Sequence, residues 1–357
     1  MKIFSKLEYK IPKREKIALI GMDNTQIAKD IIKNKFTKIN LDKINIFILV
    51  KLFFSKGIKI YDFKINYLEQ YLKFIGSDIL ICFIDNNPLF WRIKNKIPSL
   101  KVLIIQNGWR TKTFDIFESK IRKRQDYKVD YFFTFNRFIS KLYKDFVKAK
   151  FVEIGSVENN FYNIYKYKKK IDILYLSEYF DLNKSTAKLD WFSIETILLP
   201  FIKNFCIQNN YSFKILPRVN SKKEFSFFKN ILGKDINFNY LKKEVSSYEI
   251  IDRAKIVVFS STTLGYEAFA RKKKIFGICC KLPSDPSRCF GWPKYSRKNK
   301  GFFWINNMDL TKFKKKLNNL IKISNNEWLK NSKIFQQNLM IYDKNNFKLK
   351  SIINSLS

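Results

Sequence analysis

The stretch that decides the fold is FSSTTLGYEAFARKKKIFGI, residues 259–278. An apolar run that predicts a strand, KIVVF, ends at Phe259 and leads directly into four hydroxyl residues, Ser260–Thr263. A segment with the pattern of a helix and a single glutamate, Glu267, comes next, and a second apolar run closes the stretch at Ile278. Strand, polar turn, helix and strand in this order are typical of a parallel α/β sheet.

The same alternation continues through the chain in two blocks. Apolar runs that predict strands lie at 16–21, 44–50, 78–85, 101–108, 129–135 and 150–156, and then at 171–177, 212–218, 236–240 and 273–278. Helix-like stretches lie between and after them, at 63–75, 136–148, 190–209, 221–232, 246–254 and 308–355. Because these strand runs are apolar on both faces, we expect parallel sheets that helices cover on both sides.

A polar stretch separates the two blocks. Residues 157–170, VENNFYNIYKYKKK, are rich in asparagine and lysine and have the pattern of a linker. A chain of 357 residues also fits two domain cores better than one. We therefore expect an N-terminal domain at 1–160 and a C-terminal domain at 161–357, the second ending in helices.

The composition limits the chemistry that the chain can perform. It contains no histidine, which removes the usual general base, the histidine-containing triads and the common zinc sites. Its five cysteines, Cys82, Cys206, Cys279, Cys280 and Cys289, show no CxxC spacing, so neither a disulfide framework nor a metal site is indicated. We expect no bound metal or other cofactor, acid–base chemistry by carboxylates, Lys, Tyr or water, and a reducing cytoplasm as the compartment.

The chain is strongly basic. Lys and Arg number 69 against 31 Asp and Glu, a net charge of +38 that would favour nucleic acid or an anionic membrane surface. The lysines are spread along the whole chain, which indicates a solvated surface, with peripheral contact to anionic lipid as the alternative. The longest apolar run, INIFILVKLFF at 44–54, is interrupted by Lys51 and is well short of the roughly 20 residues that span a bilayer.

Five of the predicted strands end in polar residues. These are Asp85 and Asn86; Gln106, Asn107, Gly108 and Arg110; Ser177 and Glu178; Arg218; and Ser260–Thr263. Each set has a purely structural explanation, as helix caps, a turn, an exposed loop acid or a surface ion pair. Because ligands of parallel sheets bind beyond the carboxyl ends of the strands, the five sets together predict a shared cleft.

The hydroxyl turn is the most specific of these endings. Hydroxyls and free backbone N–H groups at the start of a helix form a site for phosphate or carboxylate. Glu267 lies one turn into the helix, from where it could accept two hydrogen bonds from the vicinal hydroxyls of a ribose. The combination predicts a nucleotide site. The alternative is that Glu267 pairs with Arg271, four residues along the same helix face.

These residues also carry a family resemblance. The segment SYEIIDRAKIVVFSSTTLGYEAFARKKKIFGI, residues 247–278, resembles the donor-binding segment of GT-B glycosyltransferases. Together with 83–110 and with FVEIGSVENNF at 151–161, it is similar to bacterial surface-carbohydrate and O-antigen biosynthesis proteins related to β-Kdo transferases. The resemblance covers residues 78–280 and implies two Rossmann-like domains with parallel sheets facing a central cleft. The donor would bind mainly to the C-terminal domain and the acceptor to the N-terminal domain.

The resemblance also implies roles for individual residues. It implies donor contacts for Ser260, Ser261, Thr262, Gly265 and Glu267, and a cleft lined from the other domain by Gln106, Asn107 and Gly108. The polar strand ends add Thr263 and Arg218 on the donor side, Arg218 as a plausible phosphate ligand, and Asn86 and Arg110 on the cleft side. Many related capsule enzymes have a histidine where this chain has Asn107, so a role that needs imidazole is excluded. Retaining β-Kdo transferases use a carboxylate nucleophile, for which Asp85, Glu178 and Asp181 remain open candidates.

The expected function is therefore metal-independent glycosyl transfer. The donor would be a nucleotide sugar, with Kdo or a related acidic sugar on CMP as the narrower expectation, and the acceptor a surface polysaccharide or lipopolysaccharide, free or lipid-linked. The enzyme would lie in the cytoplasm or at the inner face of the cytoplasmic membrane. Two alternatives stay open: a sugar-nucleotide epimerase of the same fold, and a nucleic-acid-binding protein, which only the charge suggests.

Overall fold

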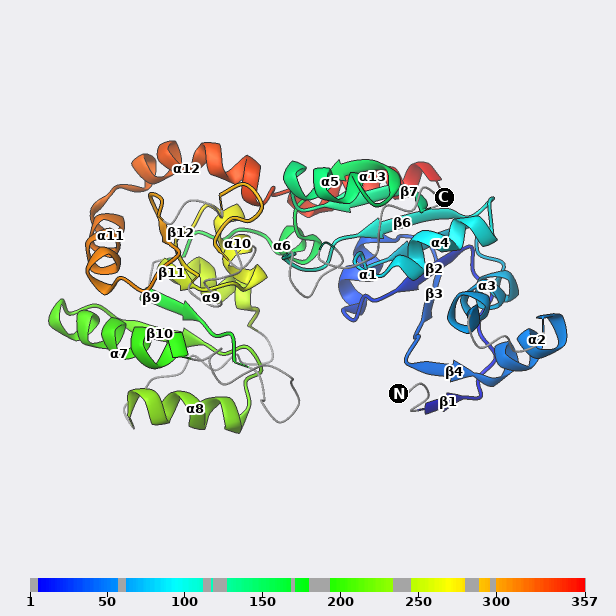
Figure 1. Cartoon of the computed structure of the whole chain (residues 1–357), viewed down its shortest axis with the longest axis horizontal. Helices are drawn as coiled ribbons and strands as arrows, with labels where there is room; N and C mark the ends of the chain where they lie inside the picture. The colour runs from blue at the N-terminus through cyan, green and yellow to red at the C-terminus, as the bar shows by residue number, and fades with distance from the viewer. Residues whose placement is uncertain are drawn as a thin grey trace. The chain divides into compact units, whose positions relative to one another are not determined.

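The structure is a computed structural model, and it describes residues 6–56, 62–111, 117, 127–167, 171–179, 193–233, 245–279, 289–295 and 300–356 (Figure 1). The chain forms two compact units. The N-terminal unit comprises Met1–Gly108, Asp115–Phe161 and Asp343–Ser357, and the C-terminal unit comprises Trp109–Phe114 and Tyr162–Tyr342.

The N-terminal unit is built on a six-stranded parallel sheet of order β3-β2-β5-β6-β7-β8. Its strands are β2 (Ile17–Ile20), β3 (Phe36–Ile39), β5 (Ile79–Cys82), β6 (Lys101–Ile105), β7 (Lys128–Thr134) and β8 (Lys148–Glu153), with β1 (Lys6–Glu8) and β4 (Lys43–Asn45) forming a separate parallel pair. Its helices are α1 (Thr25–Ile31), α2 (Ile46–Lys56), α3 (Phe63–Ile75), α4 (Pro88–Lys96), α5 (Arg137–Lys144), α6 (Val157–Phe161), the 3₁₀ helix η5 (Lys344–Asn346) and α13 (Phe347–Leu356).

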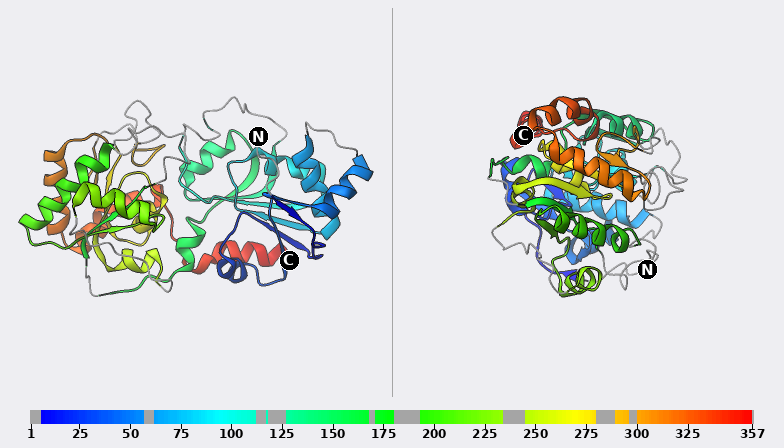
Figure 2. Two further views of the ribbon diagram at one scale, coloured as in Figure 1. Left: turned by 90° about the horizontal axis from the view of Figure 1, so that it is seen from below. Right: turned by 90° about the vertical axis from the view of Figure 1, so that its left-hand side faces the viewer.

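Helices cover both faces of this sheet, as the apolar character of its strands requires. All four residues of β2 and all four of β5 are buried. After β2 the chain adds β3 on one side of β2, and it then adds β5, β6, β7 and β8 in turn on the other side. Right-handed crossovers therefore place α1 on the face opposite to α4 and α5. In the view from below, α1 and α13 lie on the same side of the sheet (Figure 2).

The C-terminal unit contains a second parallel sheet, of order β10-β9-β11-β12-β13. Its strands are β9 (Ile171–Leu176), β10 (Phe213–Leu216), β11 (Ala254–Phe259), β12 (Lys274–Ile278) and β13 (Trp304–Ile305). Its helices are α7 (Ser193–Gln208), α8 (Lys222–Leu232), α9 (Ser247–Arg253), α10 (Thr263–Ala270), α11 (Leu310–Lys322) and α12 (Asn325–Leu339). The expectation of α/β blocks with parallel sheets is confirmed.

Each sheet has one point where the strand order reverses. In the N-terminal unit this point lies between β2 and β5, and in the described part of the C-terminal unit it lies between β9 and β11. The crevice beyond the strand ends at such a point is where ligands of this kind of sheet bind. The turns after β9 and β11 are therefore the first place to look for a site.

The strand predicted at 44–50 is wrong. Only Lys43–Asn45 is extended, and α2 begins at Ile46. The buried Asn45 side chain decides this, because its Oδ1 accepts from Phe47 N at 3.1 Å and from Ile48 N at 3.4 Å, as a helix N-cap does. The second strand of the sheet is instead β3, which the sequence analysis did not identify. The strand predicted at 236–240 lies outside the described residues.

The two units differ from the expected ranges 1–160 and 161–357 at their joints. The stretch 157–170, expected as a linker, begins with the short helix α6. Residues 343–357 belong to the N-terminal unit, because Asp343 N donates to Asn160 Oδ1 at 3.0 Å and Asn346 Nδ2 donates to the Val157 carbonyl at 3.0 Å. Among the described residues, no helix has both the length and the apolar character needed to cross a bilayer.

Candidate functional site at the carboxyl edge of the C-terminal sheet

The turn between β11 and α10 is the centre of the candidate site. Thr262 is the N-cap of α10, but its side chain makes no capping hydrogen bond. Instead, the free backbone N–H groups of Ser261 and Thr262 donate to the carboxylate of Glu178, at 2.7 Å for Thr262, and the Ser261 hydroxyl donates to the same carboxylate at 2.8 Å. Glu178 follows β9, so this contact spans the point where the strand order reverses.

The geometry shows that this helix start can hold an anion. Two N–H groups, one hydroxyl and the positive end of the α10 dipole converge on a buried carboxylate. The turn was expected to bind phosphate, whereas here the anion is Glu178 of the same chain. Glu178 was one of three candidates for the catalytic carboxylate, and the structure places it as a cap of α10. Another candidate, Asp181, lies outside the described residues.

The other hydroxyl residues of the turn have different environments. Ser260 is fully buried, and within the described part of the chain its Oγ has no hydrogen-bond partner. Thr263 Oγ1 accepts from Trp109 N at 2.8 Å, and the Trp109 ring stacks on Tyr266 with centroids 3.6 Å apart. Burial raises the pKa of Tyr266 well above its usual value, so this phenol stays protonated. Ser260 is therefore the buried member of the turn whose hydroxyl has no hydrogen-bond partner among the described residues.

Gly265 has a packing role in this structure. A Cβ atom at this position would lie 2.1 Å from Cδ2 of the buried Phe259 ring. The glycine therefore allows α10 to lie directly on the end of β11. Its expected contact with a donor stays a prediction.

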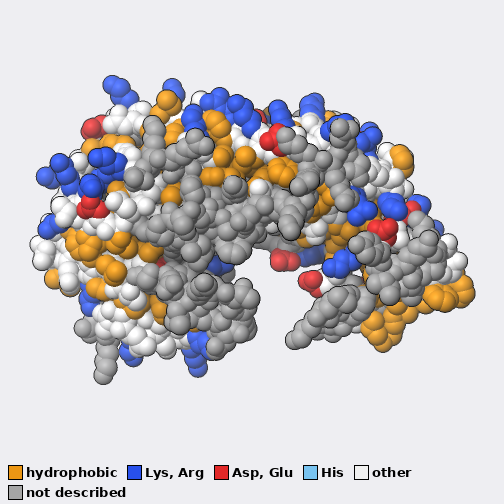
Figure 3. Space-filling view, in the orientation of Figure 1, with side chains coloured by type: hydrophobic (Ala, Val, Ile, Leu, Met, Phe, Trp, Pro, Cys, Tyr) orange, Lys and Arg blue, Asp and Glu red, His pale blue; other side chains and the backbone are white. Residues whose placement is uncertain are grey.

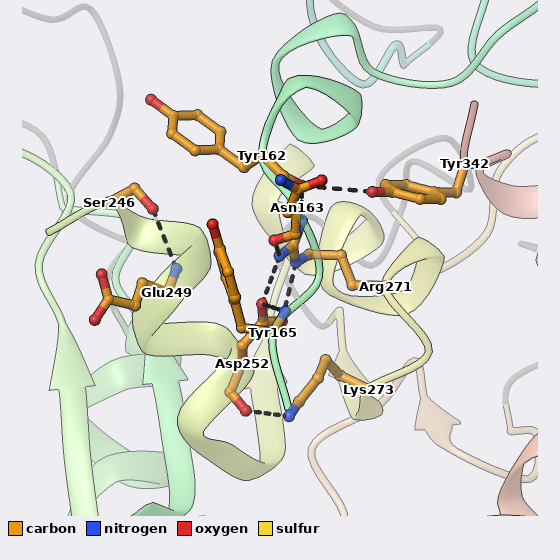
Figure 4. Close-up of polar contacts among 9 residues, drawn as sticks. All are labelled: Tyr162, Asn163, Tyr165, Ser246, Glu249, Asp252, Arg271, Lys273 and Tyr342. Atoms are coloured by element: carbon orange, nitrogen blue, oxygen red, sulfur yellow. Dashed lines mark hydrogen bonds and ion pairs between the residues drawn. The ribbon is translucent and has the colours of Figure 1, made fainter. Parts of the chain in front are cut away.

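Glu267 is buried one helical turn beyond the hydroxyl residues, and Tyr248 Oη donates to its Oε2 at 3.0 Å. Arg271, the basic neighbour considered as its partner, forms a buried ion pair with Asp252: Nε lies 3.0 Å from Oδ1 and Nη2 lies 2.5 Å from Oδ2. The same guanidinium donates to the carbonyls of Tyr162 and Asn163 (Figure 4). Asp252 therefore neutralises the charge of Arg271 in these contacts.

The Arg271–Asp252 cluster lies away from the hydroxyl turn. It forms one wall of a pocket of about 360 Å³ whose lining also includes Lys255 and Lys272. Lys255 and Lys274, another lining residue, stand at the beginnings of β11 and β12. The pocket is therefore at the amino edge of the sheet, opposite to the edge that carries Ser260–Thr263.

Arg218 is exposed, and its backbone belongs to a second buried anion site. The carboxylate of Glu224 accepts from the N–H groups of Arg218, Val219 and Asn220 at 2.8 to 2.9 Å and from the Ser177 hydroxyl at 2.5 Å. The sequence analysis missed Glu224. A readable signal exists, because SKKE at 221–224 has the spacing of a capping box and Ser221 Oγ does accept from Glu224 N.

The expected residues of the N-terminal unit lie together at the ends of β5 and β6. Asp85 is fully buried, and its carboxylate accepts from Tyr143 Oη at 2.5 Å and from Asn107 N at 3.3 Å. Gln106 Oε1 accepts from Phe135 N at 2.8 Å, and its Nε2 donates to the Gly108 carbonyl at 2.8 Å. These contacts hold neighbouring strand ends together, and the acceptor and catalytic roles expected here stay predictions.

Two further residues expected at this edge differ from the others. Asn86 is half-buried beside Asn87, and it is Asn87 that caps α4. Arg110 is buried and belongs to the C-terminal unit, with the segment Trp109–Phe114.

Comparison with solved structures identifies the fold. The chain is similar to UDP-GlcNAc 2-epimerase from Methanocaldococcus jannaschii, in complex with UDP-GlcNAc and UDP, with 13% identity, a TM-score of 0.52 and coverage of 98% of this chain and 99% of that one. It is also similar to the wall teichoic acid polymerase TagF, with 10% identity, a TM-score of 0.55 and coverage of 95% and 88%. The UDP-GlcNAc 2-epimerase from Neisseria meningitidis, bound to UDP-GlcNAc, gives 11% identity, a TM-score of 0.50 and coverage of 98% and 99%. At these identities the likeness shows the fold, and it confirms the GT-B-like α/β class.

The family is given by the sequence. No curated protein matches the chain. The family model described as "putative O-antigen biosynthesis protein" matches residues 103–357, which include the whole of the hydroxyl turn, Glu178 and Glu267. Because this match covers well over half of the chain, the protein belongs to that family of O-antigen biosynthesis proteins.

Proposed function

We propose that the protein is a metal-independent glycosyltransferase that uses a nucleotide-sugar donor. The observation that carries the proposal is the anion-holding start of α10, which lies at the reversal point of the C-terminal sheet with Glu267 one turn beyond it. Family membership in O-antigen biosynthesis supports the proposal, as does a fold shared with TagF and with epimerases solved with UDP-GlcNAc.

In this proposal the donor phosphate replaces Glu178 at the α10 N-terminus. The N–H groups of Ser261 and Thr262 and the Ser261 hydroxyl would then donate to phosphate oxygens, with the helix dipole stabilising the charge of the departing nucleotide. Glu267 would accept from the ribose hydroxyls. The displaced Glu178 carboxylate would remain next to the donor, where it could act as base or nucleophile.

The acceptor is proposed to be a surface polysaccharide or lipopolysaccharide chain. A Kdo or related acidic-sugar donor on CMP is the narrower form of the proposal, and it rests on the sequence resemblance alone. We place the reaction in the cytoplasm, with peripheral contact to the anionic inner face of the cytoplasmic membrane. The charge of +38 supports that contact.

A sugar-nucleotide epimerase is the second candidate, because two of the similar structures are 2-epimerases that cover nearly the whole chain. The absence of histidine argues against it, since the related epimerases rely on carboxylates together with histidines.

One experiment tests the proposal and separates the two candidates. Thermal shift would first screen CMP, UDP and CDP, and the sugar nucleotides of any nucleotide that stabilises the protein would then be incubated with and without a glycan acceptor. Transfer predicts a product only with acceptor, whereas epimerisation predicts conversion of the donor alone. If no nucleotide raises the melting temperature, the site assignment fails before the question of reaction type arises.

A further inference from the structure

Helix α2 of the N-terminal unit exposes large apolar side chains to solvent. Phe47, Val50, Phe53 and Phe54 are 42%, 47%, 58% and 82% exposed, and we call these four residues the α2 patch. Leu7, Tyr9 and Ile11, in and just after the neighbouring β1, are also exposed. Figure 3 shows hydrophobic side chains gathered at this end of the unit, at the lower right of the view.

The α2 patch is not the core-facing side of the helix. That side carries Ile48 and Leu52, which are buried. At 100° per residue the patch lies on the opposite side, so α2 is apolar nearly all round. A helix of this kind is normally covered on every side, and a concentrated exposed apolar surface marks an interaction site.

The charges around the patch indicate what covers it. Residues 6–16 and 42–56 contain eight Lys or Arg against three Asp or Glu. Lys51 is solvent-exposed and flanks the patch next to Phe47 on the helix, with its Nζ 5.2 Å from the centroid of the Phe74 ring. A second copy of the chain docked through this face would bring like charges together. An anionic lipid surface would offset them while accepting the phenylalanines.

We infer that the α2 patch inserts into the interfacial region of an anionic lipid membrane. With 11 residues, α2 is about 16 Å long, so it lies along the interface and does not cross the bilayer. The phenylalanine rings enter the boundary between headgroups and acyl chains, and the surrounding lysines contact lipid phosphates. This assigns a surface to the peripheral contact named in the proposed function, but its test needs no donor or acceptor.

The test is vesicle co-sedimentation of the full chain. Wild-type protein should bind phosphatidylcholine vesicles that contain phosphatidylglycerol more tightly than vesicles of phosphatidylcholine alone. Phe53→Gln/Phe54→Gln should weaken binding by about tenfold or more, because two rings no longer leave water. Lys51→Gln should weaken binding only to the phosphatidylglycerol vesicles.

A matched control is Ile207→Gln/Ile334→Gln, which removes two equally exposed apolar side chains from α7 and α12 of the other unit. It should bind vesicles as wild type does. Equal vesicle binding by the Phe53→Gln/Phe54→Gln variant would overturn the inference. The inference would also be overturned if wild-type protein sedimented as a dimer and only the Phe53→Gln/Phe54→Gln variant sedimented as a monomer. The α2 patch would then be covered by a second copy of the chain. Nucleotide binding should be the same in all these proteins, so a failed vesicle test would overturn the membrane contact but leave the proposed glycosyl transfer standing.

Discussion

In the N-terminal unit the polar side chains at the carboxyl edge of the sheet bond to their own neighbours, whereas in the C-terminal unit the corresponding groups converge on one carboxylate at a helix start. Asp85 joins Tyr143 to Asn107, and Gln106 joins Phe135 to Gly108, all across adjacent strand ends. At the carboxyl edge of the C-terminal sheet, Glu178 receives the donors of the Ser261–Thr262 turn.

The two edges also differ in their position relative to the reversal of strand order. The Asp85 network lies between β5 and β6, away from the reversal between β2 and β5. At that reversal point the Ile84 side chain packs against Gly21, where a Cβ atom would lie 2.7 Å from its Cγ1. Glu178 and Ser261 instead lie directly on the reversal between β9 and β11. The comparison indicates that similar polar strand ends stabilise the fold in one unit, while in the other they surround the helix start that we propose as the donor site.

The largest expected effect tests the structural half of this comparison. Asp85→Ala should lower the free energy of unfolding by about 2–4 kcal/mol, because it leaves the buried Tyr143 hydroxyl and Asn107 N–H without their acceptor. Urea unfolding measures this loss, with Asp145→Ala, an exposed acid at the end of α5, as the control. A variant as stable as wild type but without transfer activity would instead favour Asp85 as the catalytic carboxylate.

The second effect tests the ligand-binding half. Glu267→Gln should weaken nucleotide binding by about 10- to 150-fold, since a charge-assisted hydrogen bond contributes about 1.5–3 kcal/mol. Calorimetric titration with CMP and UDP measures it, and the melting temperature should change little, because a Gln side chain can still accept from Tyr248. Glu327→Gln, an exposed acid on α12, is the control. Unchanged nucleotide affinity would mean that Glu267 serves only to hold α9 and α10 together.

Part of the fold and of the candidate site could be predicted from the sequence. The alternation of apolar and helix-like runs predicted most strands, the start of α10 and the polar residues that follow β5, β6, β9 and β11. It failed at Asn45, where one side chain caps a helix whose composition favours a strand. Composition and period describe average preference, and one capping side chain at a helix start can override it.

The pairing of the polar residues was beyond sequence reasoning. Nothing local distinguishes Asp85, which is enclosed by Tyr143, from Glu178, which follows its strand in the same way. Which donors each carboxylate meets depends on residues 58 and 83 positions away. Arg271 is a similar case, because its helix neighbour Glu267 was the local choice and Asp252 on α9 is the partner observed.

The third effect concerns Glu178 itself. If the donor phosphate takes its place, Glu178→Gln should tighten nucleotide binding severalfold, because the competing negative charge at the α10 N-terminus is removed. The same change should lower the free energy of unfolding by about 1 kcal/mol, since a neutral amide accepts the three hydrogen bonds more weakly. Titration and urea unfolding of one protein measure both. Weaker nucleotide binding would show that Glu178 supports the site and does not compete for it.

The smallest expected effect is on stability and concerns Asp130, a carboxylate that should keep its partner whether or not nucleotide is bound, unlike Glu178. Asp130 of β7 lies in the N-terminal unit with Lys94 Nζ 2.6 Å from its Oδ2. Burial acts to raise the pKa of Asp130, but hydrogen bonds from Lys94 and from Val102 N, together with the charges of Lys94 and Lys101, outweigh it and lower the pKa. Because the folded pKa lies below the unfolded one, the carboxylate stabilises the fold above the unfolded pKa. That contribution is lost as the pH falls through the folded pKa.

Asp130→Asn should therefore be less stable than wild type at neutral pH by at most about 1 kcal/mol, as a partly exposed ion pair allows. The difference should shrink as the pH is lowered past the unfolded pKa, and urea unfolding at neutral and acidic pH measures it. Saturating nucleotide should leave this difference in stability unchanged, because the Lys94–Asp130 pair belongs to the N-terminal unit, where no residue is proposed to bind the nucleotide. For Glu178→Gln, by contrast, the stability difference from wild type should depend on nucleotide, since ligand binding releases Glu178 from the groups that it caps. A nucleotide-dependent stability difference at Asp130, or a nucleotide-independent one at Glu178, would contradict the division of roles between the two edges.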